Sequence, residues 1–216
     1  MPARRSATVH HPLFARFYAR IADAADRSGV GEHRDEMLSG LTGRVVEVGC
    51  GPGTNFAHYP DTVTEVLAVE PESFLRDRAA EAAPSAGVPV RVVEGIAHDL
   101  PCPAGWADAA VASLVLCSVA DPVDALTEMR RVVRPGGELR FYEHVGADTP
   151  KLARLQRRLD VAWPHLAGGC HLTRDTAAAI EAAGWEVRDI RRFEFRPCAM
   201  AAPVAPHILG RATNPA

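Results

Sequence analysis

A continuous apolar run that ends in three alternating glycines constrains this chain more than any other feature. Residues 45–48 are apolar except for Glu47, which is the pattern of a strand buried on both faces of a parallel sheet. Gly49, Gly51 and Gly53 follow at once. Glycine is required where the chain turns with positive φ, or where a ligand approaches the backbone more closely than a Cβ allows. The stretch therefore predicts a nucleotide-type cofactor held against bare backbone at the end of a strand.

The spacing of the glycines distinguishes two kinds of cofactor. A dinucleotide loop places its third glycine three residues after the second, and that position counted from Gly51 is Thr54. The observed pattern is instead E-x-G-x-G-x-G from Glu47, which resembles motif I of the class I S-adenosylmethionine (SAM) methyltransferases. A carboxylate here would repel a pyrophosphate but suits a ligand that carries an ammonium and a sulfonium. The resemblance implies SAM as the cofactor and S-adenosylhomocysteine as its product.

The length and patterning of the chain predict one α/β domain. With 216 residues, 47% of them hydrophobic, we expect residues 1–216 to form a single SAM-dependent methyltransferase domain. Residues 1–40 are expected to supply lid helices, and residues 148–172 a helical insert over the site. Strand patterns fall at residues 45–48, 66–69, 88–93, 107–116, 138–142, 186–195 and 205–212. Helical patterns fall at residues 12–27, 31–38, 54–58, 72–83, 121–133, 151–166 and 173–183.

The alternation of strand and helix indicates the fold class. It predicts a Rossmann-like, mostly parallel, doubly wound sheet of seven strands with an antiparallel late strand. Pro135-Gly136-Gly137 is expected to end the helix of residues 121–133. We expect residues 214–216 to be frayed.

Composition limits the partners and the compartment. A net charge of −3 gives no general attraction to nucleic acid, so we expect a small-molecule substrate. Five cysteines without short paired spacing argue against a disulfide framework and against a zinc module, so no metal is predicted and a reducing cytoplasm fits best. No stretch approaches the roughly 20 apolar residues of a membrane span. Oligomeric state stays open.

Cofactor contacts are expected at the strand ends, because ligands of an open α/β sheet bind beyond the carboxyl ends of its strands. Glu70 ends the second strand about 20 residues past the glycines, where a carboxylate accepts both ribose hydroxyls. Ile96 stands where related methyltransferases carry an acid that reaches the adenine amine, so adenine contact falls to Ile96, to backbone amides or to His98. The predicted cofactor residues are Glu47, Gly49, Cys50, Gly51, Gly53, Asn55, Glu70, Pro71, Ile96, Ala97, His98, Ser113 and Leu114.

From Val45 to Ala212 the chain resembles one family in particular, the methyltransferase-like alkyl-thiol S-methyltransferases. The resemblance is carried by LVLCSV at 114–119, VRPGG at 133–137, EHV at 143–145, GCHLTR at 169–174 and PHILG at 206–210. It implies methyl transfer from SAM to a small lipophilic thiol. Two departures stand out. Animal members carry an N-terminal hydrophobic membrane anchor that is not expected here, and Gly168 stands where an acid is expected.

Methyl transfer of the kind that the resemblance implies requires little of the protein residues around the transferred methyl group. An in-line displacement on an activated methyl donor needs a nearby nucleophile, alignment and exclusion of water. Histidine has a suitable pKa to take a thiol proton, and we expect His144 first and His171 second in the catalytic role. Cys117 and Cys170 are interpreted as apolar pocket lining or core, because methyl transfer to a thiol needs no covalent enzyme intermediate. The predicted substrate-binding residues are Phe14, Tyr18, Cys117 and Trp163.

Three alternatives remain open from the sequence. The first is N-, C- or O-methylation of a small metabolite or phospholipid headgroup, although no Asn-Pro-Pro-Tyr segment typical of some N-methyltransferases follows the fourth strand. The second is a module that binds SAM or S-adenosylhomocysteine without catalysis. The third, a nicotinamide-dependent reductase, is disfavoured by Thr54 and by the acidic Glu47.

Overall fold

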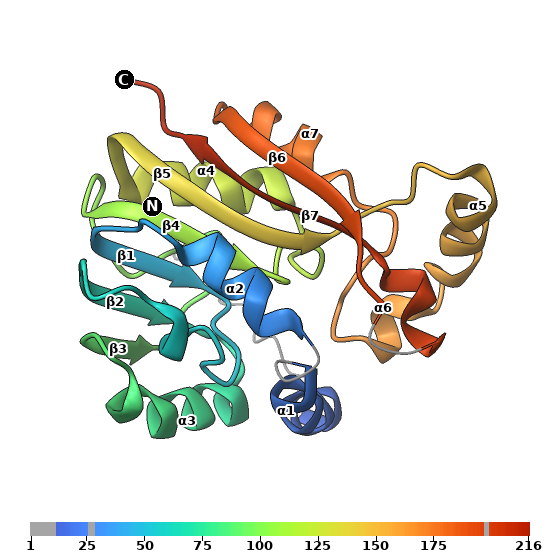
Figure 1. The fold of residues 1–216 in the computed structure, drawn as a ribbon, viewed down its shortest axis with the longest axis horizontal. Coiled ribbons are helices and arrows are strands. Elements are labelled where there is room, and N and C mark those ends of the chain that lie inside the picture. Colours follow the sequence, from blue (N-terminus) through green and yellow to red (C-terminus); the bar gives the residue numbers. More distant parts are fainter. Residues whose placement is uncertain (1–11, 26–28, 197–198) are drawn as a thin grey trace, which may run out of the picture.

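A seven-stranded sheet organises the protein. The computed structural model describes residues 12–25, 29–196 and 199–216, so the expected lid region before residue 12 lies outside the described residues. The strand order is β3-β2-β1-β4-β5-β7-β6 (Figure 1), and β7 runs antiparallel to both of its neighbours. This order confirms the expected fold class. The strands are β1 Gly43–Val48, β2 Val63–Val69, β3 Val90–Val93, β4 Ala107–Ser113, β5 Val133–His144, β6 Glu186–Glu194 and β7 Pro206–Thr213.

Helices cover both faces of the sheet. One core packs side chains of α4 and α7 against it, and a second core packs those of α2 and α3 against the other face. Burial on both sides explains why β1 and β4 are almost continuously apolar in sequence. The described helices are α1 Pro12–Ala25, α2 Gly31–Leu38, α3 Ser73–Ala82, α4 Pro122–Val132, α5 Pro150–Leu159, α6 Trp163–Leu166 and α7 Thr176–Ala182, with 3-10 turns at Phe56–His58, Ala83–Ser85 and Ala199–Val204.

Residues 150–166 form two helices rather than the single helix predicted for 151–166. Helix α5 ends at Leu159, and α6 begins at Trp163. The break falls at Asp160, whose carboxylate accepts from the backbone N–H of Leu172 and from the hydroxyl of Thr173, so it turns the chain toward the following loop. In Figure 1 both helices lie beyond the carboxyl end of β5. The helix expected at 54–58 is likewise shorter, a single 3-10 turn.

The C-terminal end also differs from the prediction. Residues 214–216 were expected to fray, but Asn214 is only 5% exposed. Its side-chain amide donates to the carbonyls of Arg130, Val133 and Arg134, and its oxygen accepts from the Arg130 guanidinium. These bonds fasten the end of β7 to the junction of α4 and β5. At that junction α4 ends at Val132 and β5 begins at once, earlier than the glycines at 136 and 137 predict.

Candidate active site

The three glycines form a tight bend at the carboxyl end of β1. All three have positive φ, at 67°, 55° and 87° for Gly49, Gly51 and Gly53. A Cβ on Gly49 would overlap the side chain of Val115, and one on Gly53 would overlap the ring of Phe56. A Cβ on Gly51 would meet only the Tyr18 ring, at 3.4 Å, which is an ordinary contact. Two of the glycines are therefore required by packing, whereas Gly51 leaves room beside α1.

Glu70 lies against this bend at the end of β2. Its carboxylate accepts from the backbone N–H of Gly51 at 2.9 Å and of Glu72 at 3.0 Å. The residue is only 5% exposed, and burial raises the pKa of its carboxyl group. Glu70, which is predicted to bind the ribose, therefore lies next to Gly51, the one glycine of the bend that leaves space. Pro71 is half-buried beside it.

Glu47 lies beneath the bend and is fully enclosed. Its two oxygens accept from the side-chain amide of Asn55 and from the hydroxyl of Tyr59, each at 2.8 Å. Burial raises the pKa of Glu47 to about 7. Glu47 therefore holds the side chains of Asn55 and Tyr59 beneath the bend. The neighbouring Cys50 side chain is buried in the core on the α2 face.

A buried arginine that the sequence analysis missed joins this group. Arg34 of α2 donates to the side-chain oxygen of Asn55 and, at 3.3 Å, to the hydroxyl of Ser113 at the end of β4. It is therefore a buried positive charge beside two residues that were predicted to hold the cofactor, Asn55 and Ser113. The pattern of residues 31–38 predicted only a short helix, and nothing in that pattern marks an arginine as buried.

The loop after β4 carries a strained residue. Leu114 has φ 57°, a conformation that residues other than glycine rarely adopt and that concentrates at functional sites. The next turn is held by Glu143 of β5, whose buried carboxylate accepts from the backbone N–H groups of Val115 and Leu116 at 2.9 Å each and of Cys117 at 3.4 Å. Glu143 was noted only as part of a family segment, yet it fixes the loop that carries Leu114 and Cys117.

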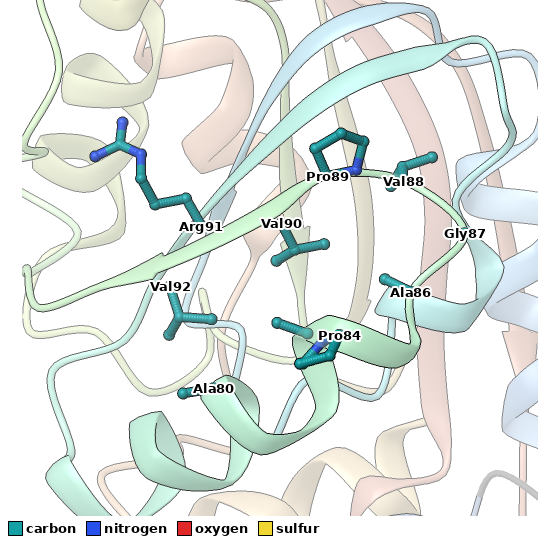
Figure 2. Close-up of a pocket in the computed structure, with 10 residues that line it drawn as sticks. Ala80, Pro84, Ala86, Gly87, Val88, Pro89, Val90, Arg91 and Val92 are labelled. Carbon is teal, nitrogen blue, oxygen red and sulfur yellow. The ribbon is translucent and has the colours of Figure 1, made fainter.

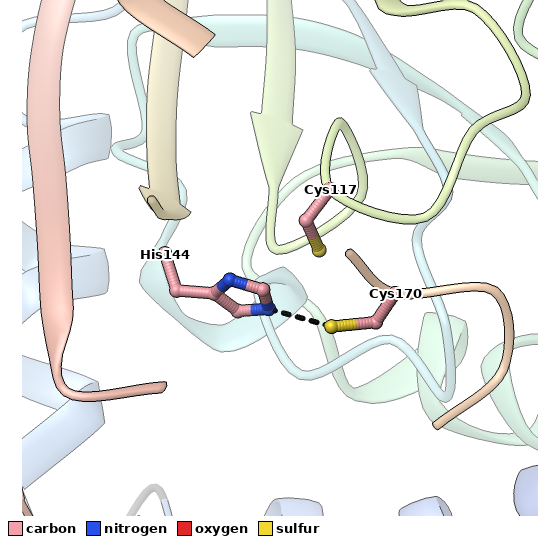
Figure 3. Close-up of side chains that lie close together, drawn as sticks. All are labelled: Cys117, His144 and Cys170. Atoms are coloured by element: carbon pink, nitrogen blue, oxygen red, sulfur yellow. Dashed lines mark hydrogen bonds between the residues drawn. The ribbon is translucent and has the colours of Figure 1, made fainter. Parts of the chain in front are cut away.

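His144 meets two cysteines at the end of β5 (Figure 3). Its Nε2 lies 3.0 Å from Sγ of Cys170, and Trp163 of α6 donates its indole N–H to the same sulfur at 3.3 Å. Cys117 completes a buried group in which the imidazole nitrogen and the two sulfurs all lie within 4.8 Å of one another. A hydrogen bond with Cys117, together with burial, raises the pKa of the Cys170 thiol. The structure thus unites the first predicted catalytic residue with two predicted substrate-binding residues.

His171 is placed differently from His144. Its ring nitrogen Nδ1 lies 3.1 Å from the carboxylate of Asp160, and its side chain is 40% exposed. Its backbone N–H donates to the carbonyl of Cys117 at 2.9 Å. These contacts hold two loops together, and they pair the ring of His171 with Asp160.

Aromatic side chains of α1 cover the site. Phe14 and Tyr18 stack with ring centroids 5.7 Å apart. Phe14 packs against Gly168, where a Cβ would overlap its ring, so α1 lies against the loop that leads to Cys170. This contact gives a packing reason for glycine at 168, where the family resemblance suggests an acid. Tyr18 extends toward Gly51 and connects the bend with the lid.

The remaining predicted cofactor residues follow β3. Ile96, Ala97 and His98 are half-buried in the loop at the carboxyl end of that strand, and Ile96 pairs with Asp99 as an isolated bridge. Because β3 is the parallel neighbour of β2, this loop lies on the same edge of the sheet as Glu70. That placement is compatible with contact to an adenine ring whose ribose is held by Glu70.

A groove of about 710 Å³ lies elsewhere, between α3 and β3 (Figure 2). Small apolar residues and prolines line it, including Ala80, Pro84, Val90 and Val92, with Arg91 as the charged member. It faces the outer edge and the amino-terminal end of β3, whereas the glycine bend is at the carboxyl end of β1. The residues that line the groove therefore do not include the acidic, histidine and cysteine side chains that lie at the other end of the sheet.

Comparison with known proteins agrees with this geometry. The family described as "Methyltransferase domain" matches residues 46–141. The thiol S-methyltransferase TMT1B of Rattus norvegicus is 36% identical over 210 residues, which are 94% of this chain and 83% of that protein. The chain belongs to the thiol S-methyltransferase family. The human thiol S-methyltransferase TMT1A is 36% identical over 187 residues, covering 83% of this chain and 75% of that protein.

Solved structures show the fold of this thiol S-methyltransferase family member independently. A methyltransferase from Bacillus halodurans superimposes with a TM-score of 0.68 at 15% identity, over 84% of this chain and 97% of that one. A geranyl diphosphate methyltransferase in complex with GPP and sinefungin gives a TM-score of 0.67 at 15% identity, over 87% and 78% of the two chains. The protein is a class I SAM-dependent methyltransferase, and SAM is its cofactor. Among the described helices, none has the length and apolarity to cross a membrane.

Proposed function

We propose that this protein transfers the methyl group of SAM to the sulfur of a small lipophilic thiol. The observation that carries the proposal is the extent of the likeness to the rat thiol S-methyltransferase, which covers 94% of this chain. The domain match covers only residues 46–141, the part that would hold the cofactor. The relative therefore matches the acceptor side as well, where α1, the insert and His144 lie.

On the cofactor side, the residues present fit the donor. When bound, SAM supplies a methyl group that is already activated by a positive sulfur. Gly51 leaves room against the bend, and Glu70 offers a buried carboxylate for two ribose hydroxyls. The guanidinium of Arg34 suits the carboxylate of the methionine portion, because a charged pair in a buried site is stronger than one in water.

On the acceptor side, His144 is the better placed of the two predicted histidines. It lies in the buried group with Cys117 and Cys170, whereas the ring of His171 is paired with Asp160. We infer that His144 promotes ionisation of the acceptor thiol, and that Tyr18, Phe14 and Trp163 exclude water around the acceptor. A thiol is a few per cent ionised at neutral pH, so modest help is sufficient.

The proposal also covers the domain organisation, the partners and the compartment of the protein. We infer a single domain over residues 1–216, a small-molecule acceptor without nucleic acid, and a reducing cytoplasm. The net charge of −3 supports the second inference. The described cysteines, Cys50, Cys102, Cys117 and Cys170, are all unpaired, which supports the third.

The acceptor is tested by offering three matched compounds that share one alkyl or aryl body and end in a thiol, an amine or a hydroxyl. Products are identified by mass spectrometry after incubation with SAM. We expect the thioether to form much faster than the other two products. Methylation of the amine or of the hydroxyl compound, with no thioether formed, would contradict the proposal.

The role of His144 is tested by comparing His144→Ala with His171→Ala on two thiols of different pKa. Loss of the residue that promotes ionisation should lower kcat on an alkyl thiol by roughly 100-fold and should lower it less on an aryl thiol that is already ionised. His171→Ala is expected to affect both thiols equally. Equal losses on both thiols for His144→Ala would reduce this residue to part of the pocket wall.

A further inference from the structure

Three soft ligand atoms converge at one buried point beside the proposed acceptor pocket. Cys117 follows β4, His144 ends β5, and Cys170 lies in the loop before α7 (Figure 3). Their sulfur and nitrogen atoms lie within 4.8 Å of one another. A tetrahedral zinc ion with bonds of about 2.3 Å to sulfur and about 2.0 Å to nitrogen holds such atoms roughly 3.5 to 3.8 Å apart. The three side chains therefore need only small shifts to share one ion.

Groups around the cluster supply the outer shell that thiolate ligands require. The indole N–H of Trp163 donates to Sγ of Cys170 at 3.3 Å. The hydroxyl of Ser118 lies 3.4 Å from Sγ of Cys117. Donors of this kind orient metal-bound thiolates and balance their charge. Two thiolates also neutralise a divalent zinc ion, so the filled site would carry no net charge in its buried surroundings.

The backbone around the cluster is fixed by other contacts. Glu143 accepts from the N–H of Cys117, and the N–H of His171 donates to the carbonyl of Cys117. The loop of Cys170 is packed against α1 through Gly168. Ligands on supported segments hold a metal more tightly than ligands on free loops. The site is therefore preformed in the folded chain.

Nε2 of His144 is already engaged in this arrangement. It lies at hydrogen-bond distance from Cys170, which leaves it poorly available to take a proton directly from an acceptor thiol. A metal ion would use that nitrogen and the two sulfurs at once. Three protein ligands also leave the fourth position of a tetrahedral zinc open, as catalytic zinc sites do.

We propose that Cys117, His144 and Cys170 bind one zinc ion, whose fourth position takes the sulfur of the acceptor thiol. The second part rests on the proposed function. The cluster lies at the acceptor end of the site: Sγ of Cys117 is 3.7 Å from the carbonyl of Leu114, a predicted cofactor residue, and the loop of Cys170 packs under α1.

The reaction balances without a further reagent. The acceptor thiol releases its proton to water as its sulfur binds zinc, and the metal keeps it as a thiolate at neutral pH. That sulfur forms a bond to the methyl carbon while the bond from carbon to the sulfonium breaks, and the electron pair passes to the departing sulfur. The products are a thioether and neutral S-adenosylhomocysteine. A thioether is a weaker ligand than a thiolate, so it leaves the metal.

Sequence spacing argued against a zinc module, and the fold explains the difference. Zinc modules with a local signature have cysteines two to four residues apart. Here Cys170 follows His144 by 26 residues, and Cys117 belongs to a different loop. The carboxyl ends of two neighbouring parallel strands bring Cys117 and His144 together, and the insert returns Cys170 to them.

Metal binding is measured on the full chain without an affinity tag, reduced and freed of metal by chelation. The protein is incubated with zinc, desalted and analysed for zinc by mass spectrometry. In parallel, cobalt(II) is added as a spectroscopic substitute, since thiolate ligands give it an intense charge-transfer band. We expect one zinc per chain and that band. Cys117→Ser, Cys170→Ser and His144→Gln should each weaken zinc by roughly 100-fold or more, whereas the control Cys102→Ser should bind like the wild type.

Alkylation of the wild-type protein makes the test independent of whether the variants fold. Zinc should slow iodoacetamide labelling of Cys117 and Cys170 and leave labelling of Cys102 unchanged. The proposal is overturned if less than a stoichiometric amount of zinc is retained, if the cluster variants bind zinc as well as Cys102→Ser does, or if zinc fails to slow the labelling of Cys117 and Cys170.

A third measurement separates this inference from the proposed function. If the metal-free protein methylates the thiol at the same rate as the zinc-loaded protein, the proposed function stands and the role of zinc in catalysis is wrong. If zinc binds with the stated stoichiometry but amines are methylated instead of thiols, the metal site stands and the proposed function is wrong. Addition of the acceptor thiol to the cobalt form should change its visible spectrum, and an unchanged spectrum would refute binding at the fourth position.

Discussion

Replacing Gly51 by alanine tests how the glycine bend holds the cofactor. The added methyl group would meet only the Tyr18 ring at 3.4 Å, so it does not clash with the protein. It must, however, adopt φ of 55°, which costs a residue with a Cβ about 1 kcal/mol. In a chain of this size that loss lowers the melting temperature by about 2–4 °C. The effect on the ligand is larger, because the methyl group occupies the space left against the bend.

The expected loss of affinity follows from overpacking. Inserting a methyl group into a well-packed contact typically costs about 1–3 kcal/mol, which corresponds to a roughly 5- to 150-fold larger dissociation constant. Gly40→Ala is the matched control. Gly40 also has positive φ, at 73°, but a Cβ there would have nothing within 4 Å. Both variants should lose similar stability, whereas only Gly51→Ala should lose affinity.

The assay is calorimetric titration with S-adenosylhomocysteine, together with thermal unfolding of the unliganded proteins. Gly49→Ala gives a further contrast, because its Cβ would overlap Val115 and should destabilise the fold itself. If Gly51→Ala binds S-adenosylhomocysteine as tightly as Gly40→Ala does, the space beside Gly51 is not where the cofactor lies, and the argument from the bend is refuted.

Three further predictions concern buried polar groups. Glu70→Ala should weaken S-adenosylhomocysteine by about 1–3 kcal/mol in calorimetry, and an unchanged affinity would remove Glu70 from the site. The pKa of Glu47 is raised from 4.5 to about 7 in the folded chain, so protonation of Glu47 favours the folded state. Raising the pH from 6 to 8 should therefore lower the free energy of unfolding by about 1 kcal/mol. Unfolding of Glu47→Gln, measured over the same pH range, should lack this decrease. Asn214→Ala should cost about 1–3 kcal/mol in denaturant unfolding, because it leaves buried carbonyls without donors, and a loss near zero would show that the end of the chain is frayed as its sequence suggests.

Much of the cofactor half could be predicted from the sequence because its signals are local. The apolar run of β1, the glycines that follow it and the acid at the end of β2 lie on two consecutive strands, and the parallel topology brings strand ends together. Glu70 and Gly51 are 19 residues apart, and the structure joins them by a hydrogen bond of 2.9 Å. Periodicity and motif spacing therefore carried most of the information.

The acceptor half and the buried Arg34 of the cofactor half could not be predicted in the same way, because their contacts are long-range. Arg34 reaches Ser113 across 79 residues, and no helical period marks it as buried. Glu143 holds the loop of Cys117 across 26 residues by accepting backbone N–H groups, which leave no trace in side-chain patterns. Asp160 breaks the predicted insert helix by bonding a loop that comes after it. In each case the tertiary partner decides the role of the residue.

The central claim is that the methyl group of SAM, held at the glycine bend, passes to a thiol sulfur. The most direct measurement uses SAM with a deuterated methyl group and an alkyl thiol, and follows the label by mass spectrometry in wild type and in Gly51→Ala. We expect a deuterated thioether in amounts equal to the S-adenosylhomocysteine formed, with strongly reduced formation by Gly51→Ala at limiting SAM. Label that appears on nitrogen, oxygen or carbon acceptors and never on the thiol would contradict it.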